Sequence, residues 1–137
     1  PNLAEGHAFL AAALAWSGQG AAALEAIRDA MTLNPVYPGW YLFFFGLANF
    51  EHGRFDAAEE AFRRGMLRNP EFLPNRFFLV ATLSALDRLD PARREMAALQ
   101  DLDPDFSPDT RSPFLPFADP ERRAHFADLF RRLQPRR

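Results

Sequence analysis

The side chains that could carry chemistry in this 137-residue chain are three histidines and a run of aspartates after residue 100. His7, His52 and His125 lie far apart in the sequence and show none of the paired spacings of a metal or acid–base motif. The chain has no cysteine and no lysine, which excludes thiolate zinc sites, a cysteine nucleophile, and Schiff-base or P-loop lysine chemistry. We therefore expect no catalytic centre in this chain.

The densest acidic cluster comprises Asp101, Asp103, Asp105 and Asp109. It lacks the glycine and the terminal glutamate of a calcium-binding loop, and Pro104 interrupts it. A solvated loop between helices accounts for these carboxylates better than a metal site does. We predict no bound metal and no cofactor.

The overall composition is that of a globular domain, with 48% hydrophobic and 25% charged residues. A formal net charge of −2 gives no electrostatic footprint for nucleic acid or anionic lipid, and the arginine pairs near the C-terminus are interpreted as a solvated face. No apolar stretch approaches the roughly 18 residues of a membrane helix. We expect no nucleic-acid, membrane or small-molecule partner, and a cytoplasmic location, which the absence of cysteine fits.

A repeat with a period near 34 residues runs through the chain. Three similar phrases end at Pro35, Pro70 and Pro104, which are 35 and 34 residues apart. This period, with Gly, Ala, Phe and Pro at fixed offsets, is that of the tetratricopeptide repeat, a helix–turn–helix unit. The repeat-defining residues are Gly18, Ala23, Pro35, Gly46, Gly53, Ala58, Phe62, Pro70, Ala92 and Pro104.

The middle copy fits the repeat best. Gly46 and Ala58 are small, which lets the two helices of a repeat cross closely, and Phe62 fills the wedge between repeats. Pro70 ends the second helix, because proline has no backbone N–H to donate a hydrogen bond and does not fit inside a helix. Glu59 and Arg63, four residues apart, are expected to pair on the helix surface.

Polar caps predict where several helices begin. Asp56, with a glutamate three residues later, resembles a capping box. Asp90 before Pro91 predicts an N-cap followed by proline at the first helical position, and Asp119 starts the last helix in the same way. Helices are predicted over residues 2–17, 21–33, 38–52, 56–68, 74–87, 91–101 and 120–133.

The sequence predicts one all-α domain, a right-handed solenoid of three repeats over about 4–37, 39–72 and 73–106. Segment 104–118 is rich in proline and phenylalanine, so it is expected to be extended and fixed to the surface by its rings. Apolar residues of 120–133 recur at helical spacing, and solenoid ends require a cap, so this helix is predicted to cap the domain. An alternative, in which the third copy is a non-repeat helical hairpin, stays open.

Three stretches are more specific than the repeat. Residues 31–41 (MTLNPVYPGWY), the tripeptide 53–55 and the phrase 116–120 (PFADP) before a final helix resemble the C-terminal tetratricopeptide region of bacterial class III adenylate/guanylate cyclases. Similar tails occur on bacterial winged-helix transcriptional regulators. The resemblance covers essentially the whole chain and implies a non-catalytic regulatory module that makes protein contacts. Since the chain begins at Pro1 without a methionine, further repeats or another domain are expected before it; a stand-alone adaptor is a third interpretation.

In tetratricopeptide units the first helix of each pair lines a concave groove. By register, the groove residues are Trp16, Trp40, Phe43, Phe44, Leu47, Phe50, Phe77, Phe78 and Ala81. Segment 40–50 is apolar at nearly every position, which is typical of a helix buried on all sides. We therefore predict an apolar partner in the groove, either an amphipathic helix or a second copy of the chain. Packing within a single chain is the alternative, and the absence of lysine excludes a basic clamp for acidic peptides.

Overall fold

A computed structural model describes residues 2–106 and 119–134, and over these residues it contains seven helices and no strand. The helices are α1 (Leu3–Trp16), α2 (Gly20–Leu33), α3 (Trp40–Glu51), α4 (Phe55–Arg68), α5 (Leu73–Ala85), α6 (Leu89–Leu102) and α7 (Pro120–Arg131). All seven predicted helices are confirmed, and each end lies within two residues of its predicted position.

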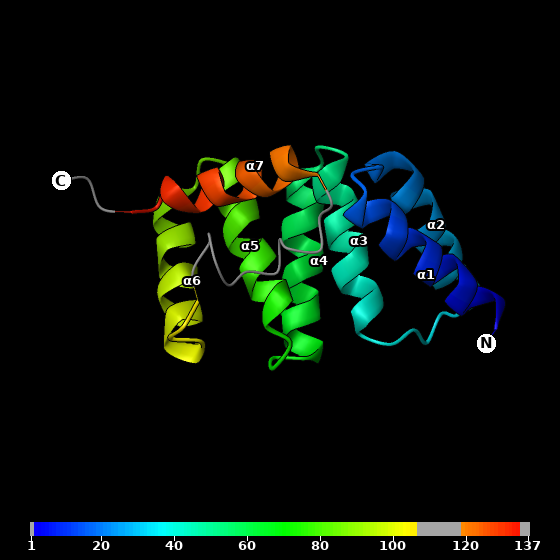
Figure 1. The fold of residues 1–137 in the computed structure, drawn as a ribbon. Helices are drawn as coiled ribbons and strands as arrows, with labels where there is room; N and C mark the ends of the chain where they lie inside the picture. Colours follow the sequence, from blue (N-terminus) through cyan, green and yellow to red (C-terminus); the bar gives the residue numbers. More distant parts are fainter. Residues whose placement is uncertain (1, 107–118, 135–137) are drawn as a thin grey trace.

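The first six helices form three antiparallel pairs, α1 with α2, α3 with α4, and α5 with α6 (Figure 1). Each second helix also packs on the first helix of the next pair, and the first helices α1, α3 and α5 pack on one another in sequence. This arrangement is the all-α helical repeat solenoid that the sequence predicts.

The turns inside the three pairs have the same backbone. Gly18, Gly53 and Asp87 have positive φ angles of 80°, 76° and 62°. The residue after each donates its amide to the carbonyl five residues earlier, at 2.9, 2.8 and 2.9 Å. Glycine adopts this left-handed region freely, and aspartate is one of the few other residues that enter it. The pair α5–α6 therefore shares the turn of the first two pairs, which favours a third repeat over an unrelated hairpin.

The ends of the second helices match as well. The C-cap residues Asn34, Asn69 and Asp103 have φ angles of −132°, −145° and −136° and ψ angles of 83°, 78° and 83°. Each cap directly precedes a proline of the repeat phrase. The extended ψ is what a residue before proline requires, so the proline fixes the helix end as the sequence predicts.

Two predicted helix starts are wrong by one or two residues. α4 begins at Phe55 and α6 at Leu89, before the aspartates Asp56 and Asp90 that the sequence predicts as caps, and neither helix has a side-chain cap. The cause is the turn, whose left-handed residue fixes the helix start two residues later, so both aspartates lie in the first helical turn and favour the helix dipole there. Asp119 is confirmed as the cap of α7, because its carboxylate accepts a first-turn amide at 2.9 Å.

Glycines mark three close approaches between helices. A Cβ atom at Gly46 would lie 2.6 Å from the ring of Phe62, which confirms why this crossing within the second repeat needs a small residue. At Gly65 a Cβ would lie 2.6 Å from Asn75, and at Gly20 it would lie 2.5 Å from the backbone of Glu51. The second and third contacts join neighbouring repeats, so glycine sets the spacing of the stack.

The last helix, α7, lies across the first helices of the later repeats instead of continuing the stack after α6 (Figure 1). It packs on α5 and its N-terminal turn reaches α3. The predicted capping helix is thus present, but it covers the groove side of the solenoid. Of the segment predicted to be extended, Phe106 packs its ring on Phe77 and Phe130 at 4.5 and 5.6 Å; residues 107–118 lie outside the described residues.

Candidate protein-binding groove

The structure buries much of the predicted groove inside the chain. Six of the nine predicted groove residues are at most 4% exposed: Phe43, Leu47, Phe50, Phe77, Phe78 and Ala81. In this conformation these six side chains pack within the chain, which is the alternative to a bound partner. Trp16, Trp40 and Phe44 are only partly buried and stay accessible.

The part of the groove between α3 and α5 is filled by α7, and we call it the closed half. The ring of Phe126 stacks on Phe50 at 4.9 Å and meets Phe78 edge-on at 5.3 Å. Four residues after Phe126, the ring of Phe130 lies 4.7 Å from that of Phe77. Both α7 rings are at most 1% exposed, so a helix of the same chain occupies this half of the groove.

A buried ion pair, which we call the latch, fixes the start of α7 to α3. Arg122 pairs with Glu51, whose side chain is 0% exposed, while that of Arg122 is 27% exposed. Burial removes water from the guanidinium and lowers the pKa of Arg122. A Cβ on Gly18 would lie only 3.1 Å from the Arg122 side chain, so the turn of the first repeat leaves room for the latch. At the other end, Ser84 of α5 donates its hydroxyl to the Leu129 carbonyl at 2.7 Å.

The part of the groove between α1 and α3 keeps exposed aromatic surface, and we call it the open half. Phe9 is 60% exposed and stacks on Trp40 at 5.7 Å. Trp40 and Trp16 each meet Phe44 edge-on, at 5.9 and 6.2 Å. These four rings form a continuous, mutually supported surface. Phe9 is missing from the predicted groove set, although its distance of 35 residues from Phe44 is the repeat period and could have identified it.

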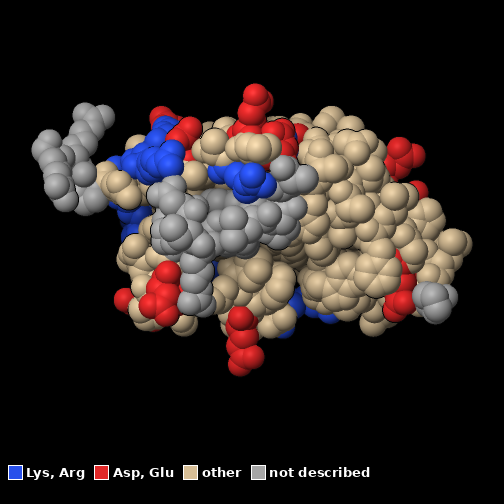
Figure 2. Space-filling view, in the orientation of Figure 1, with Lys and Arg blue, Asp and Glu red and all other residues tan. Residues whose placement is uncertain are grey.

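The face around α1 is apolar as well as aromatic. Leu3 and Leu10 of α1 are 69% and 51% exposed, and Glu5 is the single charged residue of this helix. Figure 2 shows a broad surface without Lys, Arg, Asp or Glu over α1, whereas charged side chains gather along α7. The open half therefore borders a surface that favours apolar contact over ion pairing.

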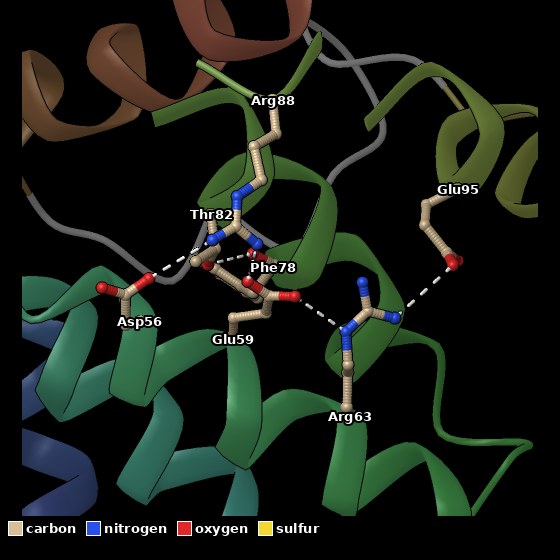
Figure 3. Close-up of polar contacts among 7 residues, drawn as sticks. All are labelled: Asp56, Glu59, Arg63, Phe78, Thr82, Arg88 and Glu95. Carbon is tan, nitrogen blue, oxygen red and sulfur yellow. Dashed lines mark hydrogen bonds and ion pairs between the residues drawn. The ribbon is translucent and has the colours of Figure 1, made fainter. Parts of the chain in front are cut away.

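Charged residues of the second and third repeats pair with one another outside the groove (Figure 3). Glu59 accepts hydrogen bonds from Arg63 at 2.9 Å and from Arg88 at 2.7 Å, which confirms the predicted pairing of Glu59 with Arg63. Arg88 also lies 3.5 Å from Asp56, and Arg63 lies 3.9 Å from Glu95. The network joins α4 to the start and middle of α6, so these charges link the second and third repeats.

In the described part of the chain, the side chains considered for metal chemistry do not come together. Within residues 2–106 and 119–134, no group of three His, Asp or Glu side chains could hold a metal ion. His52 is the C-cap of α3, and Asp109 of the acidic cluster lies outside the described part of the chain. Among the same described residues, no helix has both the length and the apolar character needed to cross a bilayer.

Comparison with known proteins agrees with this geometry. Residues 49–111 match the family model of the tetratricopeptide repeat. The match starts at the end of α3 and includes α4, α5 and α6, and thus the second and third turns described above. No curated protein sequence matches the chain significantly. The chain is therefore an all-α helical repeat solenoid whose residues 49–111 form a tetratricopeptide-type region.

Proposed function

We propose that the chain is a protein-binding module without catalytic activity of its own, and that the open half is its docking surface. Tetratricopeptide repeats generally bind proteins or peptides through their concave side. The observation that carries the proposal is the set of four contacting rings Phe9, Trp40, Phe44 and Trp16, which come from the first helices α1 and α3 and are not fully buried. Aromatic side chains held by one another lose little conformational freedom on binding and dominate binding energy at interfaces.

The chemistry of this surface favours an apolar partner. The four rings of the open half carry no charge, and the adjoining face of α1 is apolar. An amphipathic helix that presents apolar residues at i, i+3, i+4 and i+7 fits such a surface. A second copy of the chain, joined through the same face, is the alternative partner.

The resemblance of residues 31–41 and 116–120 to cyclase tails supports a more specific role. In this proposal the chain is the regulatory tail of a bacterial nucleotide cyclase and acts in the cytoplasm. The tail of a winged-helix transcriptional regulator and a stand-alone adaptor are the alternatives. The sequence encoded before Pro1 separates them, because a cyclase domain carries metal-binding aspartates and a winged-helix domain carries a basic recognition helix.

A library of phage-displayed 16-residue helical peptides, selected against the whole chain, tests the docking surface. We expect enriched peptides to bind at least about tenfold more weakly to Phe44→Glu, a loss of about 1.4 kcal/mol. The matched control is Leu67→Glu on α4, where an equally apolar side chain is 84% exposed outside the groove. If no peptide is enriched, or if enriched peptides bind both variants equally, the docking proposal is wrong. Sedimentation of the wild type separately reports association with a second copy.

A further inference from the structure

We propose that α7 is an internal ligand of the closed half, and that a partner protein displaces it with a helix carrying an arginine followed four and eight residues later by phenylalanine-sized side chains. The inference goes beyond the proposed function, which concerns the open half, because it assigns a partner to the closed half of the groove. Because α7 occupies the closed half in the structure, its contacts there show which side chains a competing helix needs.

Three side chains of α7 define the required spacing. Arg122, Phe126 and Phe130 follow one another at intervals of four residues, which places them along one face of the helix. Arg122 reaches Glu51 on α3, and Phe126 lies against one ring from α3 and one from α5. Phe130 contacts Phe77, the residue that precedes Phe78 on α5. The closed half therefore recognises one cation and two rings in a fixed order.

The buried carboxylate makes this recognition selective. The side chain of Glu51 is 0% exposed, and its ion-pair partner in the structure is Arg122. A carboxylate left buried without a cation is strongly unfavourable, so a helix that replaces α7 has to bring a basic residue to the same place. An apolar helix without that residue is rejected by the unpaired charge and not by a poor fit of its rings.

Displacement of α7 requires that the repeats are also held together by contacts that do not involve it. Phe43, Phe62 and Phe78 form a cluster from α3, α4 and α5, with ring distances of 6.0, 6.1 and 5.5 Å. The helix α7 adds rings to one side of this cluster, while its opposite face is exposed and polar, as at Glu121 and Asp128. In this proposal, release of α7 uncovers the rings of the closed half, while the contacts among α3, α4 and α5 hold the repeats together.

Competition within one chain sets the conditions for binding. An attached helix has a high effective concentration, so a free helix binds only in proportion to the fraction of chains with α7 released. Loss of the α7 anchors should therefore strengthen binding in trans. This effect is opposite in sign to the loss that a substitution in the groove itself would cause.

The probe is a fluorescein-labelled peptide of residues 119–134 (DPERRAHFADLFRRLQ), and the receptor is the full chain. We expect the double variant Phe126→Asp/Phe130→Asp to bind the peptide at least about tenfold more tightly than the wild type, measured by fluorescence anisotropy. A peptide with Arg122→Glu should bind this opened chain at least about tenfold more weakly, whereas a peptide with His125→Ala, altered on the exposed face, should bind unchanged.

An opened chain that melts cooperatively but does not bind the peptide overturns the inference, and so does equal binding of the Arg122→Glu peptide. If the double variant does not fold, hydrogen exchange of the wild type decides: α7 amides should exchange faster than α5 amides, and equal exchange of both overturns release without unfolding. A wild type that dimerises by exchanging α7 would assign the groove to a second copy and overturn the partner class. Library peptides that still depend on Phe44 would show that the proposed function survives such a failure.

Discussion

The closed and open halves of the groove arise from the same repeat, yet their aromatic side chains have different fates. In the closed half, Phe50, Phe77 and Phe78 are at most 4% exposed, because α7 lies on them. In the open half, Phe9 is 60% exposed, although it stacks on a tryptophan as closely as many core rings stack. Similar rings of one repeat therefore become core or stay at the surface according to whether one further helix covers them.

The side chains of α1 explain why the open half stays uncovered within the chain. Ala8 and Ala15 of α1 stand 35 residues before Phe43 and Phe50 of α3, at equivalent positions of the repeat. All four residues are at most 4% exposed, but the alanines are too short to extend over the neighbouring rings. The first repeat therefore contributes small contacts to the core and leaves the rings of Trp40 and its neighbours accessible.

The largest expected difference between the halves is in stability. Phe78 contacts rings from α1, α3, α4 and α7, so Phe78→Ala should lower the free energy of unfolding by about 3–5 kcal/mol through lost burial and a cavity. Phe9→Ala in the open half should change it by no more than about 0.5 kcal/mol. Urea titration followed by circular dichroism measures both, and similar losses for the two variants would remove the distinction between core and surface rings.

The next largest effect on stability is expected at the latch, a single contact of the closed half. Arg122→Ala leaves the buried Glu51 carboxylate without its cation and should lower the free energy of unfolding by about 3 kcal/mol. This value is at the lower end for a broken buried ion pair, because detachment of α7 relieves part of the cost. We expect α7 amides to lose protection from hydrogen exchange while α5 amides keep theirs. The matched control is Arg131→Ala, which removes an exposed pair with Asp128 and should leave protection unchanged. Equal protection of α7 in both variants would show that the latch does not hold the helix.

The smallest expected effect comes from the turn of the third repeat, at the edge of the closed half. Asp87 pairs with Arg132 just after α7, and both side chains are well exposed. Asp87→Asn removes this charge but tolerates the positive φ angle, so stability should fall by at most about 1 kcal/mol. Asp87→Ala should cost about 1 kcal/mol more, because alanine is strained in the left-handed region. Thermal melting of both variants, with Asp87→Gly as the strain-free reference, compares the two contributions.

Much of the fold could be predicted from the sequence, because local sequence signals specify the repeat. Glycine at the left-handed turns, small residues at close crossings and proline after each second helix act within a few residues of where they stand. Helix starts were harder to predict from the sequence. Asp56 and Asp90 are good caps in isolation, but the turn geometry determines where each helix begins. The short connection between the paired helices therefore overrides the capping preference of these aspartates.

The sequence shows that the predicted groove residues are apolar, but it does not show which of them the chain itself buries. An apolar segment such as 40–50 indicates burial without naming what covers it. The spacing of Phe126 and Phe130 predicts an amphipathic helix, but where that helix packs depends on contacts between residues more than 40 positions apart, such as Arg122 with Glu51. A long-range pair of this kind leaves no periodic signal in a single sequence. Phe9 is different, because its repeat register did contain the needed information.

The docking of α7 over the closed half can be measured as a distance in solution. Because the chain has no cysteine, cysteines introduced at His52, the exposed end of α3, and at Ala124, on the exposed face of α7, are its only spin-labelling sites. Double electron–electron resonance should give one narrow distance distribution in the otherwise unchanged chain. Adding Arg122→Ala and Phe126→Asp should broaden it and shift it to longer distances. A broad distribution before these changes, or the same narrow one after them, would show that α7 is not the releasable cover of the groove.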